Sequence, residues 1–156
     1  MLFRSRESAT LTLIPISQSQ HFTLVVIDNM QRQIRGYDSL YGNPEYDNAI
    51  SNNIRTIRQL LADEAVALGL TDYADNWTVI HDAARREGLP RQINGVDCGR
   101  YVILMALCLT QSPPIPLATI TPLAVSNNNN NISDYMLHKK QQKTHPTQTT
   151  SRKHRA

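Results

Sequence analysis

The sequence predicts an α+β domain in which a small mixed sheet packs on one buried helix. Its most distinctive segment is an almost wholly apolar run from Tyr101 to Leu109. Such a run without a polar face is typical of a buried helix. Two β-branched segments, 22–28 and 32–38, lie close enough in the chain to form a hairpin. Apolar residues recur at three- and four-residue steps over 48–68, which indicates an amphipathic helix.

The N-terminal part of the chain predicts three strands. The first is 11–16, where Pro15 indicates an edge position or the end of the strand. Segment 22–28 is the strongest strand in the sequence, and its continuous apolar character predicts cover on both faces. Residues 29–31 then turn the chain into the strand 32–38.

The remaining elements alternate with polar loops. A loop over 40–47 precedes the 48–68 helix, and Gly69 is placed to cap the C-terminus of that helix. A third central strand is expected at 77–81. The polar loop 82–97 leads from that strand to the buried helix.

The length of 156 residues suits one folded domain. We expect this domain to occupy residues 1–111. Residues 112–132 are rich in proline and asparagine, which predicts a low-complexity linker that buries no core. We expect residues 133–156 to form a short helix, over 133–140, followed by a basic disordered tail.

The net charge of +3 comes from the C-terminal tail. Six of the 16 basic residues and none of the 13 acidic ones lie in 138–156. The rest of the chain therefore carries ten basic and 13 acidic residues. The predicted domain has no excess of positive charge, so its composition does not favour binding to nucleic acid.

The number and spacing of the two cysteines limit which sites the chain can form. Cys98 and Cys108 lie ten residues apart on the predicted helix, roughly 15 Å, which excludes a disulfide between them. The sequence has no CxxC pair, the pattern that would indicate a zinc site, and we expect no metal or organic cofactor. The N-terminus lacks a signal core, and no segment is long enough to span a membrane. We therefore expect an intracellular protein, nuclear or cytoplasmic, in which a free thiol persists and which has no membrane partner.

Cys98 lies at the expected N-terminus of the buried helix. Unpaired backbone N–H groups and the helix dipole stabilise a thiolate there, and the thiolate is the nucleophilic form of cysteine. Gly95 and Gly99 have no Cβ, so backbone and substrate can approach closely. A buried structural cysteine is an alternative that this stretch alone leaves open.

His21 and Asp38 lie at the two outer ends of the predicted hairpin. If 22–28 and 32–38 pair around the turn, the start of one strand lies beside the end of the other. A carboxylate that holds one imidazole nitrogen leaves the other nitrogen to accept a proton from a thiol. The sequence therefore predicts that His21 and Asp38 are neighbours at one edge of the sheet, an edge that Cys98 at the start of the buried helix could face.

Three blocks of the sequence occur in a fixed order. They are His21-Phe22, Tyr37-Asp38-Ser39-Leu40 seventeen residues after the histidine, and Gln92-x-Asn94-Gly95-x-Asp97-Cys98-Gly99. These blocks resemble the signature blocks of the ubiquitin-like-protein-specific cysteine proteases, which comprise the SUMO-deconjugating, or sentrin-specific, proteases and the NEDD8-specific member. The resemblance extends from about Leu13 to Leu109, with a weaker similarity near 134–140.

The resemblance implies a papain-like fold and the roles of the site residues. Cys98 would be the nucleophile, His21 the general base and then acid, and Asp38 the orienting carboxylate. Gln92 would donate its side-chain amide to the oxyanion together with the Cys98 backbone N–H. Phe22 would form an aromatic wall of the substrate site.

By the same resemblance, Gly95 and Gly99 would also belong to the substrate site. The reaction would be hydrolysis after the C-terminal diglycine of a ubiquitin-like modifier, most similar to SUMO, in maturation or deconjugation. The implied partner is a SUMO- or NEDD8-type modifier or its conjugate, bound by a monomer.

The sequence departs from the family pattern in two respects. Phe22 stands where relatives usually carry tryptophan. Only 20 residues precede His21, whereas family domains have a substantial upstream segment with a tryptophan that helps to roof the diglycine tunnel. The chain therefore resembles the C-terminal portion of such a domain.

Three alternatives remain open from the sequence. The chain could be a truncated, catalytically weak remnant that binds a modifier or is inactive. It could be a related cysteine protease or acyltransferase that acts on other substrates. Gln92 could be a solvated loop residue without a catalytic role.

Overall fold

The computed structural model describes residues 10–70, 76–122 and 125. Within these residues the chain forms four strands, three α-helices and one short 3-10 helix. In chain order they are β1 (Leu11–Gln18), β2 (His21–Asp28), β3 (Gln33–Tyr37), α1 (Pro44–Ala67), β4 (Thr78–Ile80), α2 (Ala83–Arg86), α3 (Cys98–Leu109) and η1 (Leu117–Thr119).

The strands form one sheet in the order β1-β2-β3-β4. β2 pairs antiparallel with both β1 and β3, whereas β3 and β4 run parallel. The sheet is therefore mixed, and the predicted hairpin of the second and third strands is confirmed. β1 forms one edge, and Pro15 lies within it, as the lack of a proline N–H predicts.

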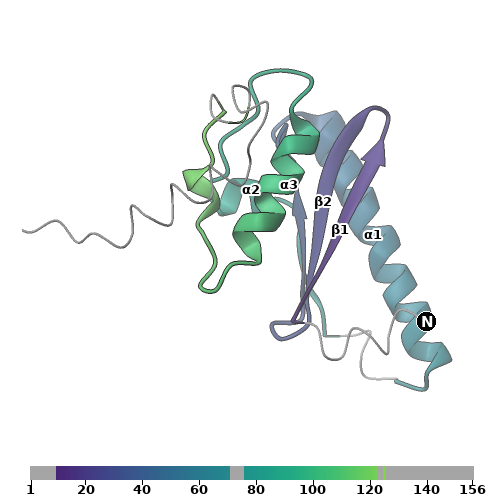
Figure 1. Cartoon of the computed structure of the whole chain (residues 1–156). Helices are drawn as coiled ribbons and strands as arrows, with labels where there is room; N and C mark the ends of the chain where they lie inside the picture. The colour runs from purple at the N-terminus through teal and green to yellow at the C-terminus, as the bar shows by residue number, and fades with distance from the viewer. Residues whose placement is uncertain (1–9, 71–75, 123–124, 126–156) are drawn as a thin grey trace, which may run out of the picture.

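The sheet lies between two helices, with α3 on one face and α1 on the other (Figure 1). Successive side chains of a strand point to opposite faces. Accordingly, Leu24 and Val26 of β2 belong to the core cluster that contains α3. Val25 and Ile27 belong to the cluster that contains α1. The predicted burial of this strand on both faces is confirmed.

Helix α1 is longer than predicted and begins at Pro44 instead of residue 48. The Asn43 side chain accepts a hydrogen bond from the Glu45 N–H at 3.1 Å, and proline is favoured at the first helical position. The predicted loop over 40–47 is therefore wrong for its last four residues. The predicted apolar stripe is confirmed up to Ala65, since the buried residues of α1 are Ile50, Ile54, Ile57, Leu61 and Ala65. Its last predicted member, Leu68, is 52% exposed and lies just past the end of the helix.

Helix α3 begins at Cys98, as predicted, but it is not buried on all sides. Ile103 is 49% exposed. The helix packs on β2 and on η1, and no described element covers the side on which Ile103 lies. The apolar sequence predicted full burial, and the structure corrects that prediction. The short helix α2 lies in the segment that was predicted as a loop.

The structure also corrects the described part of the expected linker, residues 112–122 and 125. Leu117, Ile120 and Val125 are each at most 2% exposed and belong to the core cluster with α3. The chain folds back after α3, where the Ile115 N–H donates to the Cys108 carbonyl at 3.0 Å. The apolar residues between the prolines thus fill the space beside α3. The short helix and tail expected over 133–156 lie outside the described residues.

Gly36 of β3 permits the close approach of α1 to the sheet. A Cβ at this position would lie 2.6 Å from Ile54 Cδ1 and 2.8 Å from Ile50 Cγ1. We expect Gly36→Ala to lower the free energy of unfolding by about 1–3 kcal/mol, because α1 must shift to admit the methyl group. Urea denaturation measures this change.

Gly95→Ala is the matched control for that experiment. A Cβ at Gly95 would meet nothing within 4 Å, so its stability should change by less than about 0.5 kcal/mol. Equal stability of the Gly36→Ala variant and the wild type would contradict the close packing of α1 on β3.

Candidate active site

The β2–β3 hairpin brings His21 and Asp38 together. β2 begins at His21, β3 ends one residue before Asp38, and the two strands are antiparallel. His21 Nε2 lies 2.9 Å from Asp38 Oδ1 and 3.0 Å from Oδ2. The prediction that these two side chains are neighbours is confirmed.

Asp38 is held by a second hydrogen bond. Its side chain is only 2% exposed, and its Oδ1 accepts the Leu40 N–H at 2.7 Å. The carboxylate therefore has a fixed position when it contacts the imidazole. This position orients the His21 ring.

The surroundings of His21 raise its pKa above the ordinary value of 6.5. The largest cause is the hydrogen bond to Asp38, partial burial opposes it, and the Cys98 side chain adds a smaller increase through a hydrogen bond and its charge. Because Nε2 is bonded to Asp38, Nδ1 remains for the thiol. The structure thus pairs His21 with Asp38 and places the Cys98 side chain close enough to the imidazole to affect its pKa.

Cys98 is the first residue of α3 and is 4% exposed. The N–H groups of the first helical turn have no carbonyl partner within the helix. The first intrahelical bond is donated by the Tyr101 N–H to the Asp97 carbonyl. The Cys98 N–H is therefore placed to donate to a negatively charged oxygen beside its own thiol.

Gln92 is buried and held by two neighbours. It is 6% exposed. The Ser39 hydroxyl donates to Gln92 Oε1 at 2.7 Å, and Gln92 Nε2 donates to the Asn94 carbonyl. A solvated loop residue would show neither contact, so that alternative is wrong.

The turn between Gln92 and Cys98 is organised by Asn94. Its Oδ1 accepts the N–H groups of Val96 and Asp97 at 3.0 and 3.1 Å. Its Nδ2 donates to Asp97 Oδ2 at 2.6 Å, and Arg100 donates to Asp97 Oδ1 at 3.0 Å. These bonds fix the path of the loop into α3.

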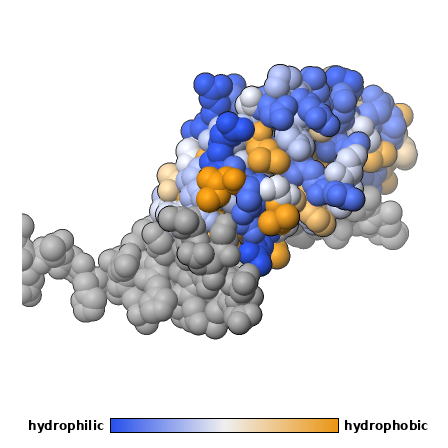
Figure 2. Space-filling view, turned by 90° about the horizontal axis from the view of Figure 1, so that it is seen from above, coloured by the Kyte–Doolittle hydropathy of each residue, from blue (hydrophilic) through white to orange (hydrophobic). Residues whose placement is uncertain are grey.

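Phe22 borders the start of α3. Its ring lies 3.7 Å from the position that a Cβ of Gly99 would occupy, and the side chain is 40% exposed. Figure 2 looks onto the end of the molecule at which α3 begins, and it shows exposed hydrophobic side chains between hydrophilic ones. Gly99 thus packs against Phe22, whereas Gly95 faces open space. The structure brings Phe22 and Gly99 to the candidate site and leaves Gly95 without such a contact.

Tyr46 is a site residue that the sequence analysis missed. Its ring centroid lies 4.6 Å from that of His21, with the planes tilted by 53°. Tyr46 belongs to the first turn of α1, which was assigned to a loop. The Asn43-Pro44 pair is a helix-start signal, and its recognition would have placed Tyr46 on a helix beside the sheet.

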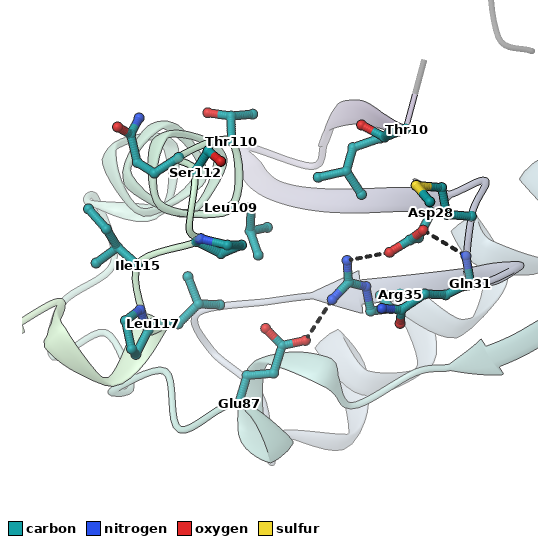
Figure 3. Close-up of a pocket in the computed structure, with 15 residues that line it drawn as sticks. Thr10, Asp28, Gln31, Arg35, Glu87, Leu109, Thr110, Ser112, Ile115 and Leu117 are labelled. Atoms are coloured by element: carbon teal, nitrogen blue, oxygen red, sulfur yellow. Dashed lines mark hydrogen bonds and ion pairs between the residues drawn. The ribbon is translucent and has the colours of Figure 1, made fainter. Parts of the chain in front are cut away.

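A pocket lies at the opposite end of the sheet (Figure 3). It has a volume of about 1120 Å³ and lies where β2 ends and β3 begins. Arg35 lies between Asp28 and Glu87 in this pocket, at 3.6 and 3.3 Å. None of the predicted site residues lines it.

Among the described residues, no three His, Cys, Asp or Glu side chains gather in a group that could hold a metal ion. In the same part of the chain, no helix has the length and apolar character needed to cross a membrane.

The raised pKa of His21 makes stability depend on pH. A raised pKa in the folded state stabilises the fold while the imidazole is charged. The contribution is therefore fully present below the ordinary value of 6.5 and is lost as the pH rises through the raised pKa. We expect the stability advantage of the wild type over His21→Gln to decrease across this window, as urea unfolding at a series of pH values measures.

Asp38→Asn provides the second arm of this experiment. The variant lacks the negative charge and one of the two carboxylate oxygens that chiefly raise the His21 pKa, so it should lose most of the same pH dependence. Parallel stability curves for the wild type and both variants would contradict the assignment of the pH dependence to this pair.

The chain is similar to curated proteases from a plant and from human. It is 33% identical over 95 residues to the ubiquitin-like-specific protease ESD4 of Arabidopsis thaliana. It is 28% identical over 106 residues to sentrin-specific protease 2 of Homo sapiens. These matches cover 60% and 67% of this chain, and 17% of each relative.

The fold is similar to solved structures of the yeast SUMO protease Ulp1. The structure of its C-terminal protease domain in complex with Smt3, the yeast ortholog of SUMO, matches with a TM-score of 0.54 and 26% identity. This match covers 73% of the present chain and 49% of the solved one. Ulp1 with its catalytic cysteine oxidised to a sulfinic acid matches with a TM-score of 0.59 and 28% identity, over 77% and 49% of the chains.

The chain thus spans about half the length of the solved domains and about a sixth of the curated relatives. A family model extends the similarity through most of the sequence. The model of the C-terminal catalytic domain of the Ulp1 protease family matches residues 7–148. This chain therefore belongs to the Ulp1 family of cysteine proteases.

Proposed function

We propose that this chain is a thiol-dependent peptidase that cleaves after the C-terminal diglycine of a ubiquitin-like modifier. The observation that carries the proposal is the hydrogen bond between His21 and Asp38, together with a Cys98 side chain close enough to the imidazole to raise its pKa. A carboxylate, an imidazole and a thiol in this order form a nucleophile, its base and the group that orients the base.

The proposed reaction begins with transfer of the Cys98 proton to His21 Nδ1. The sulfur then attacks the carbonyl carbon of the terminal glycine, and the carbonyl oxygen becomes an oxyanion. His21 returns the proton to the leaving amine, and the C–N bond breaks to give a thioester. Water, deprotonated by His21, hydrolyses the thioester and regenerates the thiol. Asp38 remains ionised and stabilises the imidazolium in both steps.

Gln92 and the Cys98 backbone N–H are the proposed oxyanion donors. The Gln92 amide nitrogen has two protons, and one of them is donated to the Asn94 carbonyl. The other proton is available to the substrate. Removal of one preorganised donor typically lowers kcat by about 10²–10³-fold, which sets the expected effect of Gln92→Ala.

A modifier with a slender C-terminus suits this site. Cys98 is 4% exposed, and the aromatic ring of Phe22 lies beside the start of its helix. A diglycine segment has no side chains to clash with such surroundings. The sentrin-specific and Ulp1 relatives support a SUMO-type modifier, with a NEDD8-type modifier as the second candidate.

The proposal includes the setting in which the protein acts. It acts as an intracellular monomer, in the nucleus or the cytoplasm, on a modifier precursor or on an isopeptide conjugate. The folded unit extends past residue 111, because Leu117 and Ile120 complete the core beside α3. Phe22, Gly95 and Gly99 are the proposed substrate-binding residues.

The test is labelling of the full chain with SUMO-, NEDD8- and ubiquitin-derived probes that carry a C-terminal electrophile. We expect a covalent adduct with the SUMO-type probe. Cys98→Ala should abolish the adduct, and His21→Ala should slow its formation by about 10²–10⁴-fold, because the general base is lost.

Cys108→Ala is the matched control, since Cys108 is the other cysteine of the chain and is buried in the core. This variant should form the adduct at a rate close to that of the wild type. The absence of any adduct from folded protein would overturn the enzymatic proposal in favour of an inactive or modifier-binding remnant. Cys98-dependent activity on other substrates alone would favour a related protease or acyltransferase.

A further inference from the structure

We infer that Ser39 is a positioning residue that orients the Gln92 side-chain amide toward the oxyanion. This inference rests on the proposed function, because it concerns how that reaction is supported. Ser39 follows Asp38 at the end of β3, and it is 1% exposed. Its hydroxyl donates to Gln92 Oε1 at 2.7 Å.

The hydrogen bonds around Gln92 determine which way its amide faces. The Asn94 carbonyl can only accept a hydrogen bond, so the group that faces it must be the amide nitrogen of Gln92. The amide oxygen then faces Ser39, and the Ser39 hydroxyl must donate. A flipped amide would place two acceptor oxygens, those of Gln92 and Asn94, against each other. The two partners together therefore select one orientation.

Ser39 and Gln92 are also joined through the main chain. The Gln92 N–H donates to the Ser39 carbonyl at 2.9 Å. Nearby, the Tyr41 hydroxyl donates to the Leu89 carbonyl at 2.8 Å. The segment after β3 is thus tied to the loop before α3 at several points, which keeps the Ser39 hydroxyl within reach of the amide.

Loss of the Ser39 hydroxyl would leave the buried amide oxygen of Gln92 without its donor. The amide would then rotate toward another donor, and its free N–H would no longer point toward the oxyanion. This N–H acts on charge that develops in the transition state. Ser39→Ala should therefore lower kcat by about 10–100-fold while KM changes by less than about threefold.

A double-mutant cycle with Gln92→Ala distinguishes positioning from a separate contribution. The substrate is a SUMO-type modifier with a C-terminal fluorogenic amide. If Ser39 acts through Gln92, Ser39→Ala should change kcat by less than about twofold in the Gln92→Ala background. An equal loss of kcat in both backgrounds, or no loss in the single variant, would overturn the inference.

Side-chain NMR relaxation of the Gln92 amide gives a readout that does not require activity. In the wild type we expect an order parameter of about 0.85 for the Gln92 amide, which is the value of a rigid backbone. In Ser39→Ala we expect a value below about 0.6. The exposed Gln18 amide is the internal reference for a mobile side chain. An unchanged order parameter in folded Ser39→Ala would overturn the inference.

This readout separates the two proposals. A wild type that does not cleave any modifier substrate, but whose Gln92 amide becomes mobile in Ser39→Ala, would overturn the proposed function and support the positioning role. If Ser39→Ala does not fold, the order parameter of the Gln92 amide in the wild type decides whether the inference stands. A Gln92 amide as mobile as that of Gln18 would then overturn the inference, and a rigid one would support it.

Discussion

The register of the β2–β3 hairpin is the constraint on which the site depends. Leu24 pairs with Tyr37, so His21 and Asp38 lie beyond the paired residues at the same end of the hairpin. A slip by one residue would turn every side chain of one strand to the opposite face. Leu24 and Val25 would then exchange their core clusters, and His21 would lose the Asp38 carboxylate. The two-sided core thus fixes the register, and the register places the imidazole.

The polar groups of the site add a second constraint. Asp38, Ser39 and Gln92 are between 1% and 6% exposed, and each has hydrogen-bonding partners. A buried polar group without a partner costs about 1–3 kcal/mol, so arrangements that break these bonds are strongly disfavoured. The same bonds that orient the reacting groups therefore also oppose alternative packings of the loop before α3.

The sequence predicted the parts of this site that follow from local pattern. Continuous β-branched residues predicted β2, and hairpin geometry placed His21 beside Asp38. The contact of Gln92 with Ser39 could not be predicted, because it joins residues 53 positions apart through a loop without periodicity. Tyr46 was missed because a cap signal was assigned to a loop. Ile103 was wrongly predicted to be buried, because an apolar helix sequence does not reveal which of its sides other elements cover.

The end of β3 couples the two halves of the proposed chemistry. Asp38 contacts the base, and the next residue, Ser39, contacts the oxyanion donor. Because the two residues share a peptide bond, a displacement of this strand end would disturb proton transfer and oxyanion stabilisation together. Groups that act as one unit show non-additive effects when they are changed singly. A substitution behind β3, such as one that pushes α1 away from Gly36, would therefore disturb both contacts at once, and its effect on kcat would be smaller than the sum of the effects of losing each contact separately.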